Sequence, residues 1–242
     1  LDFLREAEDM SKIKNAFKVI VYHNNVFTAM GYNYLGPVDG HNIREMEELF
    51  KAAVHYNKPT LVHVVTTKGK GYPYAESRPK NYHGVAPFDI EVGAEVSGKP
   101  CFSDIAGKTL CELADKDERV CAITAAMTSG TGLSEFASRY KPRFFDVGIA
   151  EQHAVTFGAG LASGGMIPFF VVYSSFLQRA YDQIIHDAAI AALPLKLLVD
   201  RAGIVGEDGE THQGIFDVAF LTTVPGIKVW SPAGYKELSR CI

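Results

Sequence analysis

The stretch RFFDVGIAEQHAVTFGAGLASGG, residues 143–165, decides the fold. Its first part, 143–147, is a short apolar run that predicts a strand, and residues 150–164 predict a helix rich in glycine and alanine. One ionisable side chain, Glu151, stands at the start of that helix. Small neighbours let a backbone or a flat ring approach closely, so the carboxylate would be partly desolvated. Buried acids cluster at active sites, which makes Glu151 the first candidate for a catalytic residue.

Helices and short apolar strands alternate on both sides of this stretch. Strands are predicted over 119–124, 167–172 and 194–200, and helices over 103–115, 134–139, 174–192 and 232–240. This alternation predicts an α/β fold with three layers and a mainly parallel sheet.

The upstream part of the chain has a different pattern. Residues 42–57 have the apolar spacing of a helix, and residues 60–67 form a β-rich run. Residues 36–41 could be a turn and a helix start only. Residues 73–104 contain four prolines and no sustained periodicity, so we expect a long connection there. The predicted domains are therefore residues 1–95 and residues 96–242.

Bulk composition narrows the class of protein. The chain has 242 residues, 47% hydrophobic and 21% charged, with a formal charge of −4. Its scattered basic residues argue against binding to nucleic acid or to an anionic membrane. It has no apolar run long enough to span a membrane and no secretory signal pattern, so we expect a cytoplasmic protein. The first residue is not methionine and the last falls within a predicted helix, so we expect a partial chain.

The four cysteines lack C-x-x-C spacing and a histidine partner. We therefore interpret them as reduced structural thiols rather than as a zinc site or a disulfide framework; they are Cys101, Cys111, Cys121 and Cys241.

Further motifs follow one another along nearly the whole chain. They are 36–41 (GPVDGH), 68–72 (KGKGY), 82–85 (YHGV), 128–133 (TSGTGL), 173–183 (YSSFLQRAYDQ), 200–206 (DRAGIVG) and 211–214 (THQG). Together with residues 146–154 (DVGIAEQHA), they resemble the thiamine-diphosphate enzymes of the transketolase superfamily, and within it the family of 1-deoxy-D-xylulose-5-phosphate synthases. The resemblance implies a transketolase-like fold, incomplete in this chain: the end of a diphosphate-binding domain, a linker, and a truncated pyrimidine-binding domain.

Roles for four residues follow from this resemblance. It implies that Glu151 hydrogen-bonds the aminopyrimidine of thiamine diphosphate and favours its imino tautomer, and that Phe176 stacks on that ring. Tyr173 and Arg179 would line the same pocket, and three-residue spacing places both with Phe176 on one helix face. Without the resemblance, Glu151 would be a first-turn acid that complements a helix dipole, and the aromatic spacing would indicate core packing.

A glycine-rich loop after strand 194–200 carries Arg201, Asp208 and His212. A guanidinium offers the planar fork that binds phosphate, and the resemblance implies that these residues bind the acceptor substrate, with His212 also catalytic. Taken alone, Arg201 and Asp208 would more often form a solvated ion pair.

Residues of the upstream part would complete the site. The resemblance implies that Tyr72 contacts the cofactor and that His83 lies near the reacting carbon. In the downstream part, Asp182 and His186 stand four residues apart, and we interpret them as a structural pair.

The resemblance implies an activity for the complete protein: it decarboxylates pyruvate and joins the two-carbon unit to glyceraldehyde 3-phosphate. The product feeds isoprenoid, thiamine and pyridoxal synthesis. The resemblance also implies that the complete protein is a homodimer. Magnesium holds the cofactor's diphosphate in this superfamily through a G-D-G segment, which this sequence lacks. We therefore expect no metal site in this chain and no activity of the chain alone. The alternatives are another transketolase-superfamily enzyme, such as a 2-oxo acid dehydrogenase β subunit, and a non-catalytic or subunit-interface module.

Overall fold

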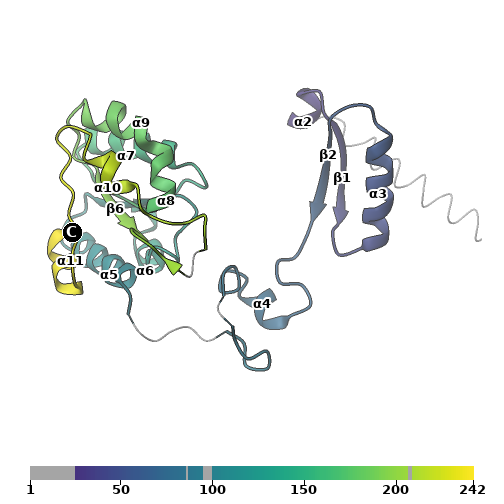
Figure 1. The fold of residues 1–242 in the computed structure, drawn as a ribbon, viewed down its shortest axis with the longest axis horizontal. Helices are drawn as coiled ribbons and strands as arrows, with labels where there is room; N and C mark the ends of the chain where they lie inside the picture. The colour runs from purple at the N-terminus through teal and green to yellow at the C-terminus, as the bar shows by residue number, and fades with distance from the viewer. Residues whose placement is uncertain (1–24, 86, 95–99, 207–208) are drawn as a thin grey trace, which may run out of the picture. The chain divides into compact units, whose positions relative to one another are not determined.

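The computed structural model describes residues 25–242 except residue 86 and residues 95–99 and 207–208. The chain divides into two compact units, Leu1–Val96 and Ser97–Ile242. Figure 1 shows the helices and strands of each unit.

The first unit contains a small β-α-β arrangement. Its elements are α2 (Val26–Ala29), β1 (Asn33–Asp39), α3 (Ile43–His55), β2 (Thr60–Val65) and α4 (Pro73–Ser77). The two strands pair in parallel, and α3 connects them and packs on both. The predicted helix over 42–57 is confirmed, and the predicted strand over 60–67 is slightly shorter.

Residues 36–41 are more than a turn. Gly36, Pro37 and Asp39 belong to β1, whose register with β2 shifts between Leu35 and Val38. A Cβ on Gly36 would clash with the carbonyl of His63 on β2, so only glycine allows this approach of the two strands. The interpretation of this motif as a turn and helix start is therefore incomplete: residues 36–39 are strand, Gly40 and His41 form the turn, and the helix begins at Ile43.

The long connection predicted over 73–104 also contains structure. Helix α4 begins with Pro73 in its first turn, where a missing N–H costs nothing. Beside it, the rings of Tyr72, Tyr74, Tyr82 and Phe88 pack with centroids 5.3 to 6.0 Å apart. Aromatic packing between residues distant in sequence has no periodic pattern, which is why sequence reasoning missed it.

The second unit is built on a parallel sheet of four strands in the order β4-β3-β5-β6. The strands are β3 (Val120–Thr124), β4 (Phe144–Asp146), β5 (Ile167–Tyr173) and β6 (Lys196–Asp200). The helices include α5 (Phe102–Ala114), α6 (Ser134–Arg139), α7 (Glu151–Ser163), α10 (Asp217–Leu221) and α11 (Tyr235–Cys241). All residues of the central strand β3 are buried, as expected for a parallel strand covered on both faces.

Two separate hydrophobic cores lie on the two faces of this sheet. Phe170 and Val172 of β5 pack into one core with Val155 of α7. Phe169 of the same strand packs into the other core with Leu110 of α5. Helix layers therefore cover both faces, with α7 and α9 (Tyr181–Gln183) on one side and α5 and α6 on the other (Figure 1). The prediction of a three-layer α/β fold with a parallel sheet is confirmed.

The prediction of one continuous helix over 174–192 is wrong in detail, because the helical segment is interrupted. It is broken into α8 (Ser174–Leu177), a 3₁₀ turn η2 (Gln178–Ala180), a helical turn α9 (Tyr181–Gln183) and a π-helical segment η3 (Ile184–Ala189). Because a π-helix bonds residues five apart, Asp182 and His186 do not form the expected pair; His186 Nδ1 lies 3.5 Å from an oxygen of Asp187 instead. Breaks of this kind are frequent at functional sites.

The four cysteines are free and fall into two classes. Cys101 and Cys241 are exposed, whereas Cys111 and Cys121 are buried. Burial raises the pKa of the Cys121 thiol to about 11 and raises the pKa of the Cys111 thiol above its ordinary value. Since the thiolate is the reactive form, the two buried thiols are doubly protected, by burial and by protonation.

We expect a thiol reagent such as a chromogenic disulfide to modify two cysteines quickly at about pH 8, and all four only after unfolding. The double variant Cys101→Ser/Cys241→Ser should show no fast reaction. Fast modification of a third thiol in the folded wild-type chain would contradict this burial.

Helix α5 packs closely on the loop that follows β3. A Cβ on Gly107 of α5 would overlap the backbone carbonyl of Gly132 in that loop. Backbone atoms cannot move aside as a flexible side chain would, so this contact requires glycine.

We expect Gly107→Ala to destabilise the folded state by about 1–3 kcal/mol through overpacking. The matched control is Gly160→Ala in the interior of α7, where a Cβ would meet nothing within 4 Å. That change should stabilise by about 0.5–1 kcal/mol because alanine loses less backbone entropy. Urea unfolding midpoints of the two variants should therefore move in opposite directions.

Candidate active site

A buried carboxylate stands where β4 leads into α7. Glu151 is the first residue of α7, and its side chain is only 2% exposed. Arg179 of η2 donates from Nη1 to Glu151 Oε2 at 3.2 Å, and its own side chain is 49% exposed. The carboxylate thus has both the N-terminal end of a 13-residue helix and a cation beside it. One partner faces the interior and the other reaches the surface.

A row of aromatic and charged side chains continues from this ion pair. The guanidinium carbon of Arg179 lies 5.7 Å from the ring centroid of Phe176, and Phe176 stacks with Tyr173 at 5.9 Å. His212 meets Phe176 edge-on at 5.2 Å. At the far end, Arg201 lies over the Tyr173 ring at 4.0 Å.

The structure thus brings together six of the side chains that the sequence selected: Glu151, Tyr173, Phe176, Arg179, Arg201 and His212. They come from the end of β5, from α7 and α8, from η2 and from the segment after β6. Asp208 lies outside the described residues. The arrangement combines a buried acid, a flat aromatic surface and two guanidinium groups, which suits a flat heterocycle at one end and an anion at the other.

Asp146 organises two loops of the site, and the sequence analysis did not select it. Its carboxylate accepts hydrogen bonds from the N–H of Ala126 at 2.8 Å, the N–H of Gly148 at 3.1 Å and the hydroxyl of Thr128 at 3.0 Å. Ala126 has a positive φ of 62°, which is uncommon for a residue with a side chain. The aspartate therefore joins the loop after β3 to the loop that leads into α7. Its position at the end of the predicted strand, two residues before Gly148, was the available signal.

Arg201 also adopts a left-handed backbone conformation, with φ of 54°. Its Nη1 donates to the carbonyl of Gly130 at 3.3 Å, in the loop after β3. A side chain on Gly130 would overlap the hydroxyl of Tyr173. The loop after β3 therefore approaches both Tyr173 and Arg201 closely.

Tyr72 and His83 belong to the first unit. The hydroxyl of Tyr72 donates to the carbonyl of Ile90 at 2.8 Å, and Nδ1 of His83 lies 2.7 Å from Nζ of Lys68. Their contribution to a site in the second unit stays a prediction.

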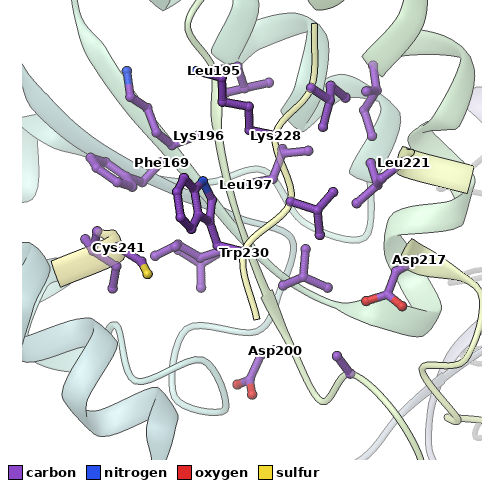
Figure 2. Close-up of a pocket in the computed structure, with 18 of the residues that line it drawn as sticks. Phe169, Leu195, Lys196, Leu197, Asp200, Asp217, Leu221, Lys228, Trp230 and Cys241 are labelled. Atoms are coloured by element: carbon purple, nitrogen blue, oxygen red, sulfur yellow. The ribbon is translucent and has the colours of Figure 1, made fainter. Parts of the chain in front are cut away.

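A large cavity lies beside β6, and it differs from the cluster around Glu151. Its volume is about 920 Å³, and its lining includes Asp200, Arg201, Asp217 and Trp230. Figure 2 shows Trp230 and Leu197 among the lining side chains, with the carboxylates of Asp200 and Asp217 in the lower part of the view. Of the six clustered side chains, Arg201 alone lines this cavity, so the cavity meets the candidate site at that residue.

Among the residues that the structure describes, no group of three or more histidine, cysteine, aspartate or glutamate side chains is arranged to hold a metal ion. No described helix combines the length and the apolar character needed to cross a membrane.

Comparisons with known proteins agree with this geometry. Residues 99–242 match the family described as the transketolase pyrimidine-binding domain, and residues 4–66 match the family described as 1-deoxy-D-xylulose-5-phosphate synthase. The chain is 56% identical over 234 residues to the 1-deoxy-D-xylulose-5-phosphate synthase of Caldanaerobacter subterraneus subsp. tengcongensis, covering 96% of the chain and 38% of that protein. It is 54% identical to the synthase of Symbiobacterium thermophilum, covering 96% of the chain and 36% of that protein. The chain thus spans under two fifths of the length of these relatives.

Solved structures show the same fold. A split-gene transketolase, described as an inactive β4 tetramer, aligns with a TM-score of 0.52 at 31% identity over 59% of this chain and 46% of its own. Transketolase from Leishmania mexicana aligns with a TM-score of 0.52 at 19% identity over 88% of this chain and 44% of its own, which is evidence for the fold alone.

We expect Arg179→Met to destabilise the chain by about 1–2 kcal/mol, because Glu151 would be left buried without its cation; the half-exposed arginine keeps the loss below that of a fully buried pair. Adding Glu151→Gln should recover part of that loss, with a coupling of at least about 0.5 kcal/mol in a double-variant cycle. Arg240→Met on exposed α11 is the control and should change stability by less than about 0.5 kcal/mol. Additive effects at Glu151 and Arg179 would show that the pair contributes nothing.

Proposed function

Since the chain belongs to the family of transketolase pyrimidine-binding domains, we propose that its second unit holds the aminopyrimidine half of thiamine diphosphate in a 1-deoxy-D-xylulose-5-phosphate synthase. In this proposal residues 1–95 are the end of the diphosphate-binding domain with a linker, and residues 96–242 are a truncated pyrimidine-binding domain. The synthase relatives cover 96% of the chain at 54–56% identity, which favours this activity over that of other superfamily members.

The observation that carries the proposal is the buried Glu151 paired with Arg179, whose guanidinium also lies beside the ring of Phe176. An aminopyrimidine needs a carboxylate at a ring nitrogen and an aromatic face to stack on, and these residues fit both needs. Glu151 holds the proton at the ring nitrogen, while Phe176 and Arg179 orient the ring. When bound, thiamine diphosphate supplies a stabilised carbanion for the decarboxylation of pyruvate.

The other end of the row fits the acceptor substrate. Arg201 binds the phosphate of glyceraldehyde 3-phosphate, because a guanidinium forms paired, charge-assisted hydrogen bonds with phosphate oxygens. His212, edge-on to Phe176, stands between the two ends and exchanges a proton with the acceptor. Tyr173 and Asp208 also bind the acceptor substrate in this proposal. Holding the acceptor in place lowers the entropic part of the barrier.

The remaining parts of the proposal concern other regions of a complete enzyme. Tyr72 contacts the cofactor and His83 assists at the reacting carbon. Magnesium binds the diphosphate through ligands that this chain does not supply, since its sequence lacks the G-D-G segment. The complete enzyme is a cytoplasmic homodimer.

Replacing Glu151 tests the proposal. In the complete enzyme, Glu151→Ala should lower kcat by about 10²–10⁴-fold, the usual contribution of a positioned acid or base. The fold should remain, as checked by circular dichroism. The control Glu112→Ala removes an exposed carboxylate of α5 and should leave turnover within about two-fold. Unchanged turnover in Glu151→Ala would overturn the assignment.

A further inference from the structure

Arg201 is held from several sides at the end of β6. Its backbone is left-handed, its Nη1 donates to the carbonyl of Gly130, and its guanidinium lies over the Tyr173 ring at 4.0 Å. A free arginine side chain has high rotamer entropy, which must be lost when it binds an anion. Contacts that fix the guanidinium beforehand would reduce that loss.

The carboxylate of Asp200 contacts both the backbone and the side chain of Arg201. One oxygen, Oδ1, accepts a hydrogen bond from the N–H of Arg201 at 2.8 Å. The other, Oδ2, lies 3.5 Å from Nη1 of Arg201. Both side chains are largely covered, with 19% of Asp200 and 31% of Arg201 exposed, so solvent screens this contact less than at an open surface.

Ser103 orients that carboxylate from a distant part of the chain. Its hydroxyl donates to Oδ2 of Asp200 at 2.6 Å, across 97 positions of sequence. The same oxygen therefore binds Ser103 and faces Arg201, so rotation of the carboxylate would move both contacts together.

The position of Ser103 is itself set by backbone packing. It lies in the first turn of α5, and a Cβ on Gly132 would overlap its carbonyl oxygen. Gly107, one turn further along α5, packs on the same loop. This loop also supplies the Gly130 carbonyl that binds Arg201. The hydroxyl of Ser103 and the carbonyl of Gly130 therefore come from two segments packed on each other.

We infer that Ser103 and Asp200 are positioning residues, which set the guanidinium of Arg201 to receive the phosphate of the acceptor substrate. This inference rests on the proposed function, because it takes Arg201 as the phosphate partner. A simpler explanation is that the Ser103–Asp200 bond only ties α5 to β6. The two differ in what is lost when the bond is removed: affinity for the phosphate substrate in one case, and stability alone in the other.

The test measures kcat and KM for both substrates in the complete enzyme. Ser103→Ala should raise KM for glyceraldehyde 3-phosphate about 3- to 10-fold, the effect of one lost hydrogen bond, with kcat and KM for pyruvate within about two-fold. Asp200→Asn should have a similar or larger effect on the same KM. Ser103→Thr keeps the hydroxyl and should restore most of the affinity.

Thr109→Ala is the matched control, because its hydroxyl ties α5 to Ser239 of α11 away from Arg201. It should lower stability without changing either KM. A Ser103→Ala enzyme that loses stability but keeps its KM for glyceraldehyde 3-phosphate would overturn the inference.

Arg201→Lys separates this inference from the proposed function. If that variant leaves KM for glyceraldehyde 3-phosphate unchanged, the phosphate role of Arg201 in the proposed function fails. An independent readout uses the 242-residue chain: nitrogen-15 NMR should show slowed rotation of the Arg201 guanidinium in wild type and faster rotation in Ser103→Ala. Equal rotation in both proteins would show that Ser103 does not position Arg201.

Discussion

The ion pair between Glu151 and Arg179 is the constraint on which the candidate site depends. A carboxylate that is 2% exposed would cost several kcal/mol to bury unless a cation and hydrogen bonds compensate it. Arg179 can reach Glu151 from η2, where the helical run after β5 is broken into short segments. The same break places Phe176 beside the guanidinium. The irregular helix and the aromatic row are thus consistent with the need to pair one buried charge.

The parallel arrangement of the strands explains why the remaining side chains of the site lie close together at one edge of the sheet. In a parallel sheet the carboxyl ends of all strands meet at one edge, and ligands bind there in open α/β folds. Asp146 ends β4, Tyr173 ends β5 and Asp200 ends β6. The loop after β3 closes the group, since Gly130 contacts the Tyr173 hydroxyl and binds Arg201. Residues far apart in sequence become neighbours because the strands that carry them are adjacent.

Local pattern predicted much of the second unit correctly. The strands over 119–124 and 167–172 and the helix over 134–139 were found close to their bounds, because apolar runs and helical spacing follow directly from which side chains face a core. The failures have a common cause. The break in 174–192, the strand character of Gly36 and the aromatic cluster around Tyr72 depend on contacts with distant backbone or rings. Such contacts override the secondary-structure propensity of the local sequence, and they leave no periodic pattern of apolar residues.

By itself the sequence determined the three-layer α/β architecture and the candidates Glu151, Phe176 and Arg179, because periodicity and short motifs are local properties that survive in a linear string. The tertiary structure alone decided the two carboxylate networks, Asp146 with the loops around it and Asp200 with Ser103. Each network joins positions separated by many residues, up to 97 for Ser103 and Asp200. Hydrogen bonds of this kind form only after the strands are ordered and the helices packed, so geometry in three dimensions, not spacing along the chain, selects the partners.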